Sequence, residues 1–86
     1  MQNYFSSYRD CVEESLKRAN AKGFETNETD VFVLVSINTS KPSNGKTTKY
    51  HLPLYKDGES VEQYLHVQVY NRGVEGNTYE LNCYIS

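Results

Sequence analysis

The sequence contains no tryptophan, two cysteines, two prolines and no apolar run long enough to cross a membrane. Two cysteines, Cys11 and Cys83, are too few for the disulfide framework of a small secreted domain. The first fifteen residues mix charges into their apolar pattern, unlike a signal peptide. We therefore expect a cytoplasmic (intracellular) protein with two reduced, buried thiols and no membrane contact.

Net charge is also low, because nine basic and eleven acidic side chains leave −2. This balance excludes a uniformly basic nucleic-acid-binding protein, although a local basic patch remains compatible with it. Eighty-six residues suffice for one small core, and an aromatic content of 13% is too high for a disordered chain. We predict a single domain over residues 1–86.

An amphipathic pattern predicts a helix over residues 4–22. Gly23 stands at the left-handed position that ends many helices, and Phe24 is placed to pack back on Ala19. The predicted buried stripe has apolar or small side chains at spacings of three and four, namely Tyr4, Phe5, Tyr8, Cys11, Val12, Ser15, Leu16 and Ala19.

A first strand is predicted over residues 31–37. Both alternating sets of side chains are apolar at its start, so both faces of the strand are expected to be covered there. Asp57-Gly58 is typical of a type I′ hairpin turn and pairs Lys56 with Glu59. Continued without interruption, this register places His51 opposite Tyr64 and Lys49 opposite His66.

Proline at position 53 fits this hairpin only if its missing N–H points away from the following strand. The free side of that strand is then a sheet edge, or the strand carries a bulge. A competing interpretation is a short helical turn at residues 60–63, which match a capping box. The alternation of Leu65, Val67 and Val69 favours the strand.

A last strand follows a glycine-rich loop and alternates Tyr79, Leu81, Cys83 and Ile85 with polar residues. Placing Tyr70 opposite Thr78 makes Tyr64 and Tyr84 cross-strand neighbours. The predicted fold class is α+β, with an N-terminal helix packed on one face of a four-stranded, mainly antiparallel sheet (α-β-β-β-β).

No catalytic constellation is apparent in the sequence. His51 and His66 lie side by side on the face away from the helix, but no third ligand joins them at metal-binding spacing. Glu62 and Glu80 share that face without a fixed separation. We therefore predict a protein that is not an enzyme, with no catalytic residues, no cofactor and no metal.

The face away from the helix is the candidate binding surface, and Phe32 and Leu34 would extend it from the first strand. Tyrosine supplies contact area at low entropic cost and is enriched at interfaces, although it also simply suits strands. The predicted binding residues are Lys49, His51, Tyr64, His66, Gln68, Tyr70, Asn82 and Tyr84.

Charge is unevenly distributed, since residues 31–58 carry +3 and the flanking segments carry −2 and −3. Lysines beside aromatic rings can hold single-stranded nucleic acid, but lysines at a sheet edge also prevent unwanted strand pairing. The favoured function is a small non-enzymatic accessory module that binds a protein through the Tyr/His-rich face or an edge strand, including as a homodimer. The compact size and the lack of catalytic chemistry suggest an accessory protein of the kind carried by a phage or mobile element. The alternative is a weak single-stranded nucleic-acid binder that uses tyrosines and lysines on the open face.

Overall fold

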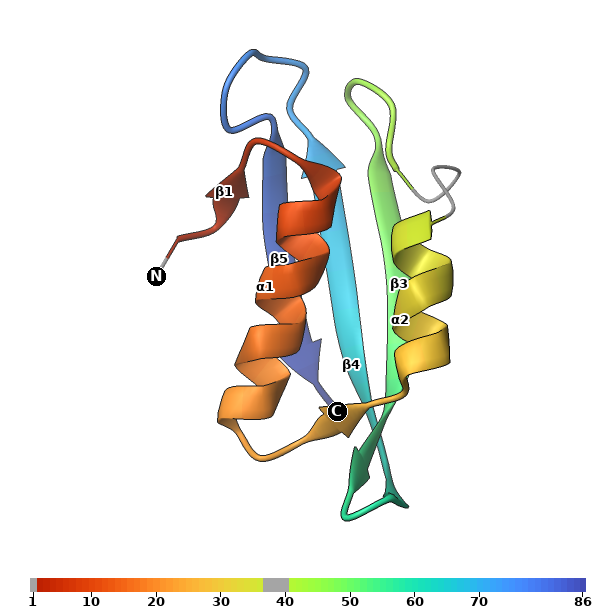
Figure 1. Ribbon diagram of the computed structural model, residues 1–86. Coiled ribbons are helices and arrows are strands. Elements are labelled where there is room, and N and C mark those ends of the chain that lie inside the picture. The colour runs from red at the N-terminus through yellow and green to blue at the C-terminus, as the bar shows by residue number, and fades with distance from the viewer. Residues whose placement is uncertain (1, 37–40) are drawn as a thin grey trace.

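The computed structural model describes residues 2–36 and 41–86 of the chain. Its elements in chain order are β1 (Tyr4–Phe5), α1 (Tyr8–Ala21), β2 (Glu25–Thr26), α2 (Glu28–Ser36), β3 (Thr47–Lys56), β4 (Glu59–Asn71) and β5 (Tyr79–Ile85). The sheet is antiparallel with the order β1-β5-β4-β3-β2, and α1 lies across one face of it (Figure 1). The predicted α+β class is confirmed, with five strands rather than four.

Helix α1 begins later than predicted because Ser7 caps it. The Ser7 hydroxyl accepts a hydrogen bond from the backbone N–H of Asp10, and Ser7 itself is extended. Tyr4 and Phe5 therefore lie outside the helix and pair with β5 as the short strand β1. The prediction of a helix starting at residue 4 is wrong in this respect.

The end of α1 agrees with its sequence signals. Gly23 has a φ of +88°, which only glycine adopts without strain. Gly23 N–H donates to the carbonyl of Asn20, and Phe24 N–H donates to the carbonyl of Ala19. These two bonds form a Schellman motif, so the predicted left-handed ending is confirmed.

The strand predicted over residues 31–37 is wrong, because residues 28–36 form α2 and residue 37 lies outside the described residues. Asn27 Oδ1 accepts hydrogen bonds from the N–H groups of Thr29 and Asp30 and so caps this helix. Acidic Glu28 and Asp30 in the first turn suit the helix dipole. These local signals outweigh the strand preference of the valines that follow.

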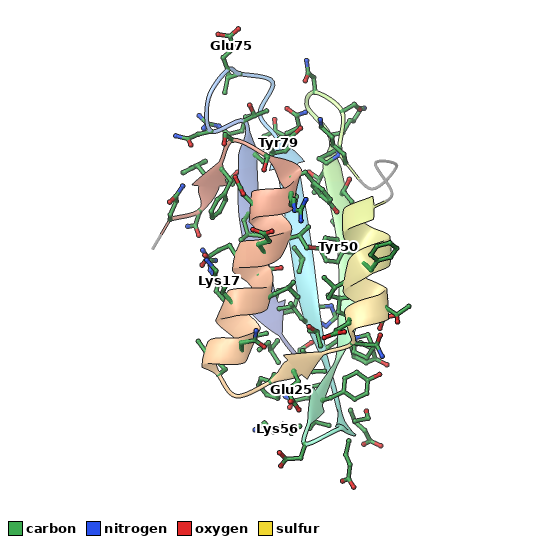
Figure 2. All side chains as sticks on the ribbon, viewed as in Figure 1. Lys17, Glu25, Tyr50, Lys56, Glu75 and Tyr79 are labelled. Atoms are coloured by element: carbon green, nitrogen blue, oxygen red, sulfur yellow. The ribbon has the colours of Figure 1, made fainter. Side chains whose placement is uncertain are left out.

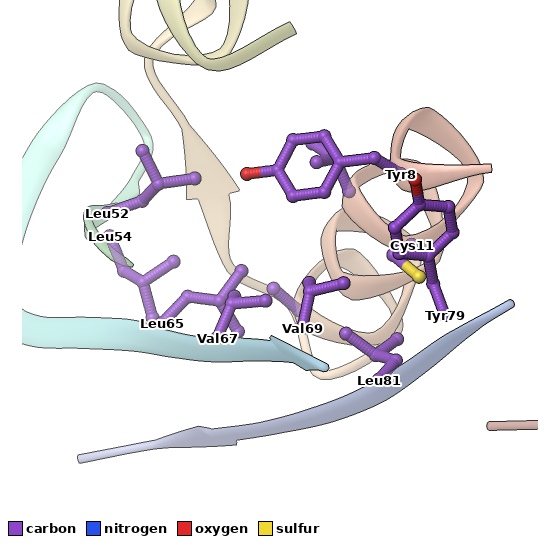
Figure 3. Packing of buried hydrophobic residues seen from close by; sticks show 11 residues of the cluster. Tyr8, Cys11, Leu52, Leu54, Leu65, Val67, Val69, Tyr79 and Leu81 are labelled. Carbon is purple, nitrogen blue, oxygen red and sulfur yellow. The ribbon is translucent and has the colours of Figure 1, made fainter. Parts of the chain in front are cut away.

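The core lies between α1 and the inner face of the sheet, as Figure 3 shows. Alternate residues of the strands point toward the helix and are almost fully buried. The cluster consists of Tyr8, Cys11, Val12 and Ala19 from α1 with Leu52, Leu54, Leu65, Val67, Val69, Tyr79 and Leu81 from the sheet. The prediction that aliphatic strand residues lie beneath the N-terminal helix is confirmed.

The β3–β4 hairpin has the predicted turn but a different register above it. Lys56 pairs with Glu59, and Asp57 and Gly58 both have positive φ, as a type I′ turn requires. A bulge then follows in β4, where residues 61–63 lie opposite Leu54 and Glu62 has a φ of +57°. Beyond this bulge the pairing is shifted by two residues, so the predicted pairs of His51 with Tyr64 and Lys49 with His66 are wrong.

The pairing of β4 with β5 is also shifted by two residues from its prediction. His66 pairs with Tyr84 and Tyr70 pairs with Glu80, so Tyr64 and Tyr84 are not direct neighbours. A shift of two residues preserves the face on which each side chain lies, because strand side chains alternate with a period of two. The predicted faces therefore hold although both predicted registers fail.

We predict that Leu65→Ala lowers the free energy of unfolding by about 2–5 kcal/mol, because it opens a cavity in the core. Its neighbour Tyr64 points to the opposite face and is 42% exposed, so Tyr64→Ser is expected to cost less than about 1 kcal/mol. Urea unfolding of both variants measures the difference. A larger loss for Tyr64→Ser than for Leu65→Ala would reverse the assignment of the faces.

Candidate binding face

The outer face is the side of the sheet away from α1, and its residues form rows across β3, β4 and β5. The rows follow from the strand pairing and run His51–His66–Tyr84, Lys49–Gln68–Asn82 and Thr47–Tyr70–Glu80, with Tyr64 at the hairpin end. All eight residues of the predicted binding surface lie on this face. Tyr50 and Tyr79, which are labelled in Figure 2, lie on the opposite, inner face against α1.

Four rings form a contiguous group near the middle of the outer face, which we call the ring cluster: His51, Tyr64, His66 and Tyr84. Tyr84 stacks on His66 with 4.7 Å between ring centroids and 14° between planes. Tyr64 meets His51 edge to face at 5.3 Å. Tyr84 is 52% exposed and Tyr64 42%, so the rings contact one another and still present area to a partner.

The surface beside the ring cluster is only shallowly hollowed. A depression of about 150 Å³ lies between the ring cluster and the row of Lys49 and Gln68. Pockets for drug-sized molecules usually exceed about 300 Å³. The depression beside the rings is therefore better shaped to meet another surface than to enclose a small molecule. A hollow of about 410 Å³ lies further along the face, where Thr47, Tyr70 and Glu80 are among the residues that line it.

Two residues that the sequence did not assign to the face lie at its far end. Tyr4 of β1 pairs with Glu80, and the guanidinium of Arg72 lies 4.7 Å from the centroid of its ring. The predicted helix stripe includes Tyr4, whereas the Ser7 cap leaves Tyr4 outside α1 and in β1. This end of the face therefore combines an aromatic ring with the positive charge of Arg72 and the negative charge of Glu80.

The expected extension of the face by Phe32 is wrong. Phe32 belongs to α2 and, together with Leu16 and Val31, lines a hollow of about 670 Å³ between the two helices. Its side chain is 68% exposed. The side chain of Leu34 is not among those described.

The predicted basic strip does not gather into one patch. Lys49 is the lysine that lies in a row of the outer face. Lys56 lies at the hairpin end, where its Nζ atom is 4.7 Å from the centroid of the Phe24 ring. The ring cluster therefore has one lysine in the adjoining row rather than a basic track.

The carboxylates of Glu62 and Glu80 are too far apart for acid–base chemistry as a pair. Glu80 lies opposite Tyr70, which is eight residues from Glu62 along β4. At about 3.3 Å per residue this separation is roughly 26 Å, whereas paired carboxylates act at about 5–10 Å.

Residues 2–36 and 41–86 contain no group of three or more His, Cys, Asp or Glu side chains that could hold a metal ion. No helix in the described part of the chain is long and apolar enough to span a bilayer.

The two cysteines are free thiols in different surroundings. Cys11 is fully buried on the sheet-facing side of α1, and burial, with a smaller effect from the Asp10 carboxylate, raises the pKa of its thiol to about 12. Cys83 is half-buried in β5, where its Sγ atom accepts a 3.8 Å contact from Arg18.

Comparison of the chain with protein-family models, curated proteins and solved structures finds no match in any of the three. The geometry of the outer face is therefore the guide to the function of the protein.

We predict that Cys11 resists alkylation at pH 8, since a thiol with a pKa of about 12 is ionised in only roughly one molecule in ten thousand. Cys83 is expected to react first with iodoacetamide in the folded protein, which mass spectrometry of peptides from a time course can measure. Protein unfolded in urea provides the control in which both thiols react. Faster modification of Cys11 than of Cys83 in the folded state would contradict the burial of Cys11.

Proposed function

We propose that this chain is a small non-enzymatic protein-binding module that associates through its outer face, with a second copy of itself as the simplest partner. The observation that carries the proposal is the ring cluster, which lies on the sheet face opposite α1, where neither of the two described helices covers it.

The composition of the face favours a protein as the partner. Interface cores are enriched in aromatic residues and depleted in charge, with polar residues around them. The ring cluster is uncharged when its histidines are neutral, and Lys49 and Glu80 lie in the rows beyond it. The stack of Tyr84 on His66 also restricts both rings before binding, which reduces the entropy lost on association.

The dimensions of the face predict weak association. Three strands about 4.8 Å apart and four rows about 7 Å apart give a footprint of roughly 300 Å². Stable interfaces usually bury about 800 Å² on each partner, and much smaller ones are transient. We therefore expect a complex that forms at high micromolar concentration.

A two-fold arrangement suits the distribution of charge on the face. Lys49 lies on the β3 side, and Glu80 lies on the β5 side one row further along. With a symmetry axis parallel to β4, the Glu80 side of each copy meets the Lys49 side of the other. Opposite charges then approach at both rims of the interface.

We predict that the weight-average mass of the wild-type protein rises between about 10 µM and about 1 mM in sedimentation experiments. Tyr84→Ser is expected to weaken self-association by about tenfold or more, as loss of a central aromatic contact does. Phe32→Ser is the matched control, because it removes an exposed ring from α2 and leaves the outer face unchanged.

A strictly monomeric wild-type protein at about 1 mM would exclude a second copy as the partner. Weakening by Phe32→Ser but not by Tyr84→Ser would contradict the use of the outer face.

Single-stranded nucleic acid is the second candidate partner, favoured by Lys49 beside exposed rings. The single lysine in the adjoining row and the mutual stacking of His66 and Tyr84 make it the weaker proposal. We predict no salt-sensitive binding when a fluorescent oligonucleotide is titrated at two salt concentrations. Binding that weakens steeply with salt and is lost in Lys49→Gln would support this candidate instead.

A further inference from the structure

His51 and His66 are direct cross-strand partners at the centre of the outer face. The bulge in β4 creates this pair, because it shifts the strand by two residues and brings His66 opposite His51. The ring centroids are 6.1 Å apart and the ring planes are inclined by 40°. Two imidazoles at this separation are close enough for one ion to lie between them.

The backbone geometry brings the two side chains toward each other. Tyr64 exchanges both backbone hydrogen bonds with Ser86 on the β5 side. Because bonding directions alternate along a strand, His66 also bonds toward β5, and its pairing with His51 is of the non-hydrogen-bonded type. Side chains approach more closely in such pairs than in hydrogen-bonded ones.

Neighbouring rings restrict the orientations of both imidazoles. Tyr84 stacks on His66, and Tyr64 packs edge to face on His51. The Nε2 atom of His66 lies 2.9 Å from the hydroxyl of Ser86, so a metal ion bound at this nitrogen would replace that hydrogen bond. A metal ion would therefore find two partly ordered imidazoles, that of the exposed His51 and that of the half-buried His66.

We propose that the His51–His66 pair is a two-histidine site for a divalent transition-metal ion, Ni²⁺ or Cu²⁺. Imidazole nitrogen is a good ligand for both ions, and both accept tetragonal coordination completed by water. A structural zinc site instead requires four protein ligands, and the described residues offer no group of three. The site uses residues of a single chain and does not depend on the proposed self-association.

Calorimetric titration of the full, untagged chain with NiCl₂ tests the site. We expect one Ni²⁺ per chain, and a loss of affinity of about tenfold or more in both His51→Gln and His66→Gln, because each variant removes the chelate. The double variant is expected to bind no better than either single variant. Both side chains lie on the outer face, and thermal unfolding of each variant checks that the fold is retained.

A relocated histidine provides the matched control. Combining His51→Gln with Thr47→His keeps the number of histidines but moves one imidazole two rows, roughly 13 Å, from its position opposite His66. This variant is expected to bind as weakly as His51→Gln alone. Equal affinity in the relocated variant and the wild type would show that histidine count, not the pair, determines binding, and would overturn the proposal.

Paramagnetic broadening by Ni²⁺ locates the ion independently of affinity. The NMR signals of His51 and His66 are expected to broaden first, followed by those of Tyr64 and Tyr84. Broadening centred on Cys83 or on the carboxylates of α1 would overturn the assignment. The absence of any binding up to about 1 mM Ni²⁺ would do the same.

Discussion

One amphipathic helix covers one face of a sheet whose three long strands alternate apolar and polar residues. Helix α1 supplies Cys11, Val12 and Ala19 to the core, and the strands supply alternate aliphatic residues. Because the side chains of a strand alternate strictly, burying Leu65 and Val67 forces Tyr64 and His66 to the other side. The outer face and everything proposed for it follow from this constraint.

The same constraint explains how far the sequence could predict the fold. Both registers were predicted two residues away from those observed, yet every strand residue of the candidate surface lies on the predicted face. The Glu62 bulge had no clear sequence signal, since a non-glycine residue there adopts a positive φ. Pro53 indicated an edge or a bulge, and the register shift lies between Pro53 and Tyr55. Helix α2 was not predicted because its alternating valines suggest a strand, although the Asn27 cap and the acidic first turn favour a helix.

The candidate site was predictable in composition but not in arrangement. Alternation alone selected the eight outer-face residues, whereas the direct pairing of His51 with His66 depends on the bulge. Tyr4 lies on the face because the Ser7 cap makes α1 begin after it, at Tyr8, which leaves Tyr4 to pair with β5. Arg72 lies on the Tyr4 ring through the loop after β4, a long-range contact that no local pattern encodes. The identity of cross-strand neighbours thus becomes known only from the structure. The face on which each side chain lies can be predicted from the sequence, because side chains along a strand alternate between the two faces.

The central claim is that the rings of the outer face meet solvent while the aliphatic residues of the same strands do not. Enhanced NMR relaxation by a soluble paramagnetic agent measures this directly, residue by residue. We predict strong enhancement for the ring protons of Tyr64 and Tyr84 and weak enhancement for the methyl groups of Leu65, Val67 and Val69. Strong enhancement of those methyl groups with protected tyrosine rings would contradict the account, because α1 would then cover the opposite face.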